Sequence, residues 1–163
     1  MLNALNTSPD HETRLHPHDH RALKLWLRLL TCSNLIDGHI RRELRANFNC
    51  TLPRFDFLAQ LERVPAGLKM SELSRRLMVT SGNVTGLADQ LEAEGLIVRD
   101  AVINDRRATR LKLTKLGQQR FAAMALVHEG WIVQLFGALN RAELEQIYAL
   151  LGKLKTGLRP PAL

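Results

Sequence analysis

The stretch VTSGNVTGLADQLEAEGL, from Val79 to Leu96, decides the fold of this chain. Thr80 is a residue type that favours the N-cap of a helix, and Gly95 suits the position just beyond a helix C-terminus, so one helix is predicted between them. Gly82 and Gly86 lie in its first turns, although a glycine inside a helix costs about 1 kcal/mol relative to alanine. A glycine leaves room for the backbone, and we interpret this end as one that closely approaches another large molecule.

Apolar residues at steps of three and four predict more helices before this stretch. A long helix from about residue 19 to residue 44 is expected first, and a second one follows from Pro53. A short third helix is expected over residues 69–77, with Ser71 as its N-cap. A tight connection then joins it to the helix that begins after Thr80, which is the order of a helix-turn-helix.

The sequence after Gly95 predicts a hairpin and two helices. Apolar and polar residues alternate from Leu96 to Leu113, and the intervening NDRR segment, residues 104–107, is expected to be the tip of a β-hairpin. Thr114 and Asn140 are the expected N-caps of two further helices. The fold class is therefore mainly α with a small β-hairpin: a winged helix-turn-helix lobe plus a helical dimerisation region from the N- and C-terminal helices.

The terminal helices carry more apolar residues than a small lobe can cover, which favours a two-fold dimer. Residues 1–18 are polar, contain two prolines and are expected to form a flexible arm. The predicted domains are a flexible arm over 1–18, a dimerisation helix over 19–50, a winged helix-turn-helix lobe over 51–116 and C-terminal dimerisation helices over 117–163.

Composition limits the class of protein. The 163 residues are 45% hydrophobic and 24% charged, as in a folded chain. No apolar run approaches the roughly 20 residues that span a bilayer, and the N-terminus does not read as a secretory signal. Two cysteines without CxxC spacing suit a reducing compartment, so a cytoplasmic protein without membrane contact is expected.

Positive charge is concentrated in one short segment. The whole chain carries a formal net charge of +7, and residues 96–120 hold seven arginines and lysines against two aspartates. A basic patch of this kind is the electrostatic footprint of a partner that is a polyanion, and a solvated basic surface is the alternative. Together with a helix-turn-helix, the patch favours double-stranded DNA.

The helix that begins after Thr80 is expected to enter the major groove by its N-terminal end. Val84, Leu87 and Leu91 are expected to face inward, which leaves Ser81, Asn83 and Thr85 to read bases. Asparagine pairs in bidentate fashion with adenine, and threonine contacts the thymine methyl group, so we expect an A·T-containing core in the DNA site. The alternative is a face of small residues that packs against another helix.

Arginines flank the predicted reading helix on both sides. Arg75 and Arg76, in the helix before it, are suited to phosphate contacts, which position a protein on DNA without specifying a sequence. Arg106, Arg107 and Arg110 flank the predicted hairpin tip, and arginine is attracted to the negative potential of the minor groove. We also expect Asp105 to hold one of these guanidinium groups.

The stretches LSRRLMVTSGNVTGLADQLEAEGLIVRD and DRRATRLKLTKLG resemble the MarR family of bacterial transcription regulators. The family marks its wing with Asp-x-Arg and a later Leu-Thr-x-x-Gly. In this chain these residues are Asp105, Arg107, Leu113, Thr114 and Gly117. The resemblance implies a homodimer on a pseudo-palindromic operator, with repression relieved by a small ligand, often a phenolic or aromatic carboxylate. We expect an aromatic carboxylate or its acyl-CoA conjugate here. This chain departs from the usual family pattern at Gly86 and Gln90, where many members carry arginine.

The resemblance also implies a place for the effector, in the crease between the first long helix, the Pro53 helix and the fifth helix. Trp26, Phe57 and Trp131 are the expected aromatic walls, with packing in the core as the alternative for each. Arg54 or His39 is expected to meet the carboxylate.

Other classes of function find less support. The sequence contains none of the motifs GxSxG, HExxH or a P-loop, so an enzyme and a catalytic residue are not expected. His16, His18 and His20 match no closed metal site, and no metal or cofactor is expected. Cys32 and Cys50 keep a redox-sensing role open. An architectural DNA-binding protein without small-molecule control is the other alternative.

Overall fold

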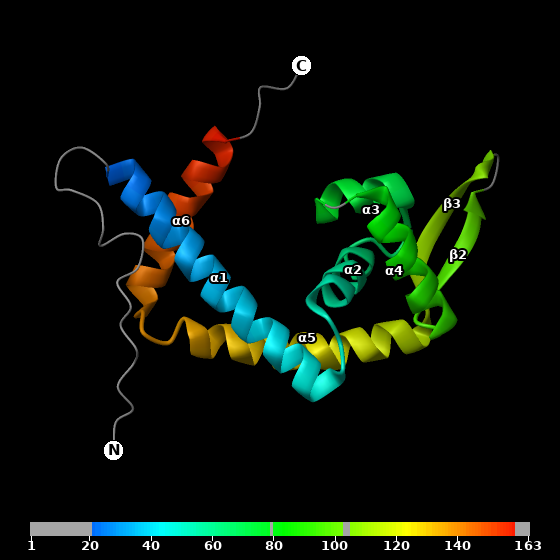
Figure 1. The fold of residues 1–163 in the computed structure, drawn as a ribbon, viewed down its shortest axis with the longest axis horizontal. Helices are drawn as coiled ribbons and strands as arrows, with labels where there is room; N and C mark the ends of the chain where they lie inside the picture. The colour runs from blue at the N-terminus through cyan, green and yellow to red at the C-terminus, as the bar shows by residue number, and fades with distance from the viewer. Residues whose placement is uncertain (1–20, 79, 103–104, 159–163) are drawn as a thin grey trace. The chain divides into compact units, whose positions relative to one another are not determined.

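The computed structural model describes residues 21–78, 80–102 and 105–158, apart from the side chains of residues 81, 101–102 and 105–108. Six helices and three strands form within these residues (Figure 1). The predicted order of four helices, a β-hairpin and two helices is confirmed, as is the mainly α fold class. In chain order the elements are α1 (Arg21–Phe48), α2 (Leu52–Glu62), β1 (Leu68–Lys69), α3 (Met70–Leu77), α4 (Ser81–Ala93), β2 (Ile97–Val102), β3 (Asp105–Leu113), α5 (Lys115–Leu135) and α6 (Arg141–Gly157).

The chain divides into two compact units, residues 1–51 and residues 52–163. The described part of the first unit is α1 and the turn that ends it. Asn49 adopts a left-handed conformation with φ 47°, and its N–H donates to the Arg45 carbonyl at 3.1 Å. The Cys50 N–H donates to the Leu44 carbonyl at 3.2 Å, so the last carbonyl groups of α1 are satisfied and the helix stops.

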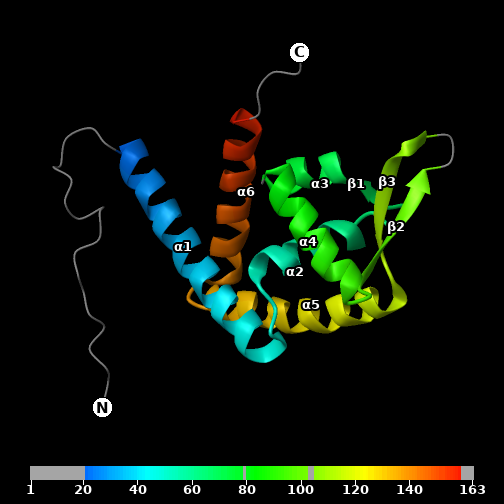
Figure 2. The same ribbon diagram turned by 45° about the vertical axis from the view of Figure 1, so that its right-hand side comes forward.

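The second unit is built around α2, which packs against α3, α4 and α5 (Figure 2). Phe57 and Leu58 of α2 are almost completely buried, as are Leu73 of α3 and Leu111 of β3. Helices with one apolar stripe reach stability by burying it against one another, and α2 is the helix that the others share. No helix in the described parts of the chain is long and apolar enough to cross a membrane.

The wing is a three-stranded antiparallel sheet in the order β1-β3-β2. β2 and β3 form the predicted hairpin, with Ile97 opposite Leu113 and Arg99 opposite Leu111. The two-residue strand β1, which was not predicted, pairs Leu68 with Leu111. It is too short for any alternation of apolar and polar residues, and its place depends on Gly67, which has φ +86°.

The Leu-Thr-x-x-Gly motif has a structural role at the base of the wing. The Thr114 Oγ1 hydroxyl donates to the Gly95 carbonyl at 2.6 Å, and the same oxygen accepts from the Gly117 N–H at 3.0 Å. A Cβ atom at Gly117 would lie 1.9 Å from the Leu96 carbonyl oxygen. The motif therefore joins the start of α5 to the turn between α4 and β2.

Three details of the prediction were wrong. Ser71 is not the N-cap of α3, because the helix begins at Met70 and the Glu72 carboxylate accepts from the Lys69 N–H at 2.9 Å instead. Residues 105–107 of the predicted hairpin tip belong to β3, since Asp105 already pairs with Val102 in the sheet, while residue 104 lies outside the described residues. The inward face of α4 is formed by Val84, Ala88 and Leu91, which are fully buried, whereas Leu87 is half-buried.

Candidate nucleic-acid interface

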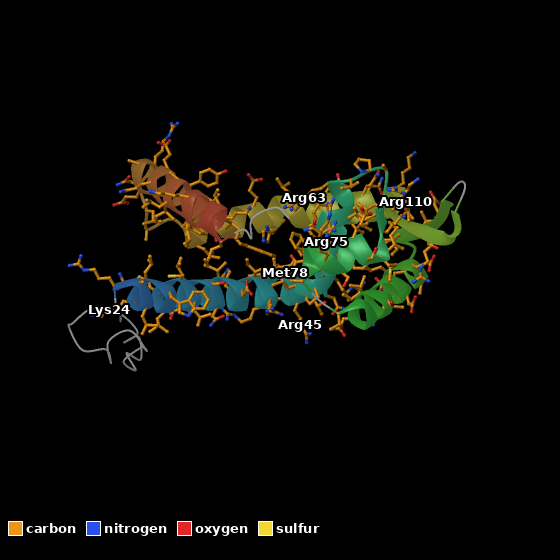
Figure 3. All side chains as sticks on the ribbon, turned by 90° about the horizontal axis from the view of Figure 1, so that it is seen from above. Lys24, Arg45, Arg63, Arg75, Met78 and Arg110 are labelled. Atoms are coloured by element: carbon orange, nitrogen blue, oxygen red, sulfur yellow. The ribbon has the colours of Figure 1, made fainter. Side chains whose placement is uncertain are left out.

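The helix-turn-helix consists of α3, a tight turn and α4. The turn begins at Met78, which has φ 54° and ψ 36° and whose N–H donates to the Arg75 carbonyl at 3.4 Å. The Met78 side chain is exposed (Figure 3). Thr80 is the N-cap of α4, as predicted, although its side chain makes no capping hydrogen bond. Buried Leu73 and Val84 fix the two helices against the core.

The outer face of α4 presents small and amide side chains to solvent. Gly82, Asn83, Thr85 and Gly86 are all exposed. A Cβ atom on either glycine would meet no other atom within 4 Å among the described residues. Within residues 52–163 this face is therefore not packed against another helix. The side chain of Ser81 lies outside the described residues.

The predicted phosphate-binding arginines lie around one carboxylate. Arg75 and Arg76 are exposed in the last turn of α3, and Arg110 lies in β3 (Figure 3). The hydrogen bond from the Lys69 N–H lowers the pKa of Glu72, and the positive charges of Arg110, Arg76 and Arg75 act in the same direction. α3 and the wing thus place positive charge on one side of this unit.

Arg110 also has a structural contact. Its Nη1 donates to the Gly67 carbonyl at 2.9 Å and ties β3 to the turn that precedes β1. The roles predicted for Asp105, Arg106 and Arg107 concern side chains outside the described residues; their backbone belongs to β3. Further along the hairpin, Lys112 pairs with Asp100 at 2.8 Å across the two strands.

Sequence reasoning missed the role of Arg99. Its side chain, on β2, forms ion pairs with Asp89 and with Glu92 on α4, the second at 3.3 Å. The count of basic residues included Arg99, but the sequence offers no signal for its partners because they come from a different element. Arg63, exposed just after α2, is a further cation that was not singled out (Figure 3).

The residues predicted to bind an effector are divided between the two units. Trp26, 57% exposed, and His39, half-buried, belong to α1. In the second unit, Phe57 is fully buried in the core. Arg54 pairs with Glu94 at the end of α4, and its Nε is buried with no hydrogen-bond partner among the described residues.

Trp131 belongs to a group of rings between α2 and α5. The His128 ring lies 6.4 Å from that of Trp131 and 4.8 Å from that of Phe55, and Phe55 lies 5.4 Å from Phe121. Burial lowers the pKa of His128 below its usual value, and the negative charge of Asp56 opposes this shift.

Within the described residues, the thiols and acidic groups show no arrangement for metal binding. No group of three or more His, Cys, Asp or Glu residues that could hold a metal ion occurs in the described ranges. Cys32 is exposed on α1, whereas Cys50 is buried and its Sγ donates to the Thr51 carbonyl at 3.4 Å.

The fold, with the exposed outer face of α4, defines a winged helix-turn-helix protein. Comparison with known proteins identifies the family within this class. The sequence profile of the MarR family matches residues 48–108. The uncharacterized HTH-type transcriptional regulator YkoM of Bacillus subtilis (strain 168) is 33% identical over 85 residues. This alignment covers 52% of the chain and only 55% of YkoM, so it spans about half the length of that relative.

Solved structures cover most of the chain. A MarR family transcriptional regulator from Silicibacter pomeroyi is 31% identical with a TM-score of 0.71, over 85% of this chain and 95% of that one. A MarR family regulator from Streptomyces coelicolor, solved in complex with DNA, is 21% identical with a TM-score of 0.75, over 90% of this chain and 94% of that one. Apo MarR from E. coli is 24% identical with a TM-score of 0.71, over 80% and 96% of the two chains.

The chain belongs to the MarR family of winged-helix transcription regulators, on the strength of the profile match and of the identity across nearly the whole Silicibacter pomeroyi protein. Members of this family are not enzymes, so the prediction of a non-enzymatic protein is confirmed by membership.

Proposed function

We propose that this chain is a sequence-specific DNA-binding repressor that acts in the cytoplasm as a homodimer and is released from DNA by a small-molecule effector. The observation that carries the proposal is the exposed outer face of α4 in a helix-turn-helix followed by a basic wing. A regulator of the same fold from Streptomyces coelicolor was solved in complex with DNA, which supports the same kind of partner here.

Base reading falls to the first turns of α4. Asn83 hydrogen-bonds adenine, Thr85 contacts a thymine methyl group, and Ser81 contributes a hydroxyl. Gly82 and Gly86 let the helix backbone approach the duplex closely, because glycine has no Cβ atom that would stand between the backbone and the DNA. The outer face of α4 carries no arginine or lysine, so the guanine contacts that such residues make are not expected, and an A·T-containing core follows.

Arginines position the protein on the duplex. Arg75 and Arg76 contact phosphates from α3, and Arg106 and Arg107 reach the adjacent minor groove from the wing. Arg110 contributes charge at the base of the wing. Its guanidinium has five N–H donors, so the bond from Nη1 to the Gly67 carbonyl leaves others for a phosphate.

The homodimer is supported by the apolar surface of the terminal helices. α6 has no buried residue, although large apolar side chains recur along it at alternating steps of three and four. This spacing is typical of a helix that packs lengthwise against another. The members of this seam are Leu144, Ile147, Leu151 and Leu154 of α6, followed by Leu158 at its C-cap. α1 exposes large apolar side chains as well, which include Leu25, Trp26 and Leu35.

The effector is an aromatic carboxylate or its CoA thioester. The rings of Phe55, His128 and Trp131 support the aromatic part of this proposal, because aromatic groups stack well on one another. Arg54 supports the acidic part, since an anion that reached its guanidinium would compete with Glu94 for it.

A selection experiment tests the function. Purified protein is used to enrich duplexes from a random library, and the expected product is a pseudo-palindrome with A·T pairs at its core. The enriched duplex is then titrated in the presence of aromatic acids and their CoA thioesters, one of which is expected to release it. Failure to enrich any sequence would point to an architectural protein, and release by a thiol oxidant alone would point to redox sensing.

A further inference from the structure

One arginine of the wing forms ion pairs with two carboxylates of the recognition helix α4. The Nη2 atom of Arg99 bonds the Asp89 carboxylate, and its Nη1 atom lies 3.3 Å from Oε2 of Glu92. Asp89 and Glu92 are three residues apart and are therefore neighbours on one face of α4. A planar guanidinium that uses two different nitrogens fixes its partners in direction as well as in distance.

The place of Arg99 in the wing gives this contact a mechanical role. Arg99 lies two residues beyond the buried Ile97, on the way to the hairpin tip. Arg99 lies opposite Leu111, which pairs with β1 on the other side of β3, so β1 holds one edge of the sheet and the Arg99 side chain ties the opposite edge strand, β2, to α4. The Arg99 side chain is 34% exposed, so the bond forms at the surface and not in the core.

Asp89 stands on the face of α4 that is proposed to meet DNA, three residues after Gly86 and seven after Gly82. An unpaired carboxylate at this position would repel the phosphate backbone. The pair with Arg99 both neutralises this charge and uses it to link the helix to the wing.

We propose that Arg99 is a positioning residue for DNA binding: it holds Asp89 and Glu92 and so sets the angle between the wing and the recognition helix. With this angle set, α4 and the wing tip reach neighbouring grooves of one duplex together. Arg99 itself need not contact a base or a phosphate. The inference rests on the proposed function and adds the residue that couples its two reading elements.

The test compares the affinity for the enriched duplex with the affinity for a random duplex of equal length. Arg99→Lys keeps the charge but loses the planar fork, and Asp89→Asn removes the partner. Each variant is expected to lower the ratio of the two affinities roughly tenfold, and the double variant is expected to lower it no further than either single one. Hydroxyl-radical footprinting is expected to show weaker protection of the flanking minor groove, with unchanged melting temperatures.

Lys112→Gln is the matched control. It breaks the bridge to Asp100, which joins the two strands of the wing without reaching α4, and it should leave the ratio unchanged. A role in charge alone would appear differently, because Asp89→Asn would then tighten binding to both duplexes and Arg99→Lys would behave as the wild type.

The outcomes separate the two proposals. If the wild-type chain prefers the enriched duplex and Arg99→Lys keeps that preference, the positioning role is overturned while the proposed function stands. If the wild-type chain prefers no duplex, both are overturned together.

Discussion

At Gly117 the first turn of α5 lies against the backbone of the turn that ends α4. A Cβ atom there would stand 1.9 Å from the Leu96 carbonyl oxygen, which is backbone and cannot rotate away. We expect Gly117→Ala to lower the free energy of unfolding by about 2–3 kcal/mol, since one of the two segments must shift. Thermal or urea denaturation measures this.

Gly130→Ala, in the same helix, serves as the control for this substitution. A Cβ atom at Gly130 meets nothing within 4 Å among the described residues. Alanine is the better helix former, so this variant should be as stable as the wild type or more stable by up to about 1 kcal/mol. Equal losses in both variants would contradict the role assigned to Gly117.

His128 should make the stability of the protein depend on pH. Burial beside Phe55 and Trp131 lowers its pKa, with Asp56 opposing, so the folded state favours the neutral ring. Below the ordinary value of 6.5 the unfolded chain takes up a proton before the folded chain does. The stabilisation is therefore present above about pH 6.5 and is lost as the pH falls toward the lowered pKa.

The variant His128→Gln removes this titration. Melting temperatures from pH 7.5 down to pH 5 should fall more steeply for the wild type than for the variant. Other groups titrate in both proteins and cancel in the difference. Parallel curves would show that the environment of His128 does not shift its pKa.

At the scale of elements, substitutions in α4 and in the wing should change DNA binding in different ways. Asn83→Ala should cost about 1–3 kcal/mol of discrimination at one base pair and leave binding to random DNA almost unchanged. Arg107→Ala should weaken binding to every duplex and reduce the slope of affinity against salt by about one charge. Anisotropy titrations at several salt concentrations measure both quantities. Equal losses on specific and random DNA for Asn83→Ala would count against base reading.

Local sequence signals predicted the elements well where a side chain acts within its own segment. Thr114 and Asn140 cap α5 and α6 as expected, because an N-cap bonds a residue three positions later in the chain. β1 was missed, since its two residues are held by pairing with β3 and by the conformation of Gly67. Ser71 was misassigned as an N-cap because the helix begins one residue earlier, at Met70, where the Glu72 carboxylate accepts from the Lys69 N–H.

For the candidate site, too, the features set within one element were predictable and the contacts between elements were not. The exposed face of α4 was predictable from helical spacing, and the error at Leu87 arose because small Ala88 is the residue that packs. The Arg99 pairs and the Arg54–Glu94 pair join residues from different elements. No periodicity reports such partners, so the sequence predicted Arg54 as a ligand-binding group and did not predict Arg99 as a link.

At the scale of the whole molecule, the seam on α6 predicts the oligomeric state. Leu151→Glu would place a charge in the middle of the apolar seam, and burying it against a second copy would be costly. We expect this variant to sediment as a monomer at concentrations where the wild type is a dimer, and to lose binding to a two-half-site duplex. Ala149→Glu introduces the same charge off the seam, where it should be tolerated. A dimeric Leu151→Glu protein would exclude α6 from the interface.

The ratio of affinities for the enriched pseudo-palindromic duplex and for a random duplex tests the central claim most directly. The wild-type protein should bind the enriched duplex at least about a thousandfold more tightly at physiological salt, as specific regulators do. Equal affinities for the two duplexes, or no binding to either, would contradict a sequence-reading role for α4 and for this chain.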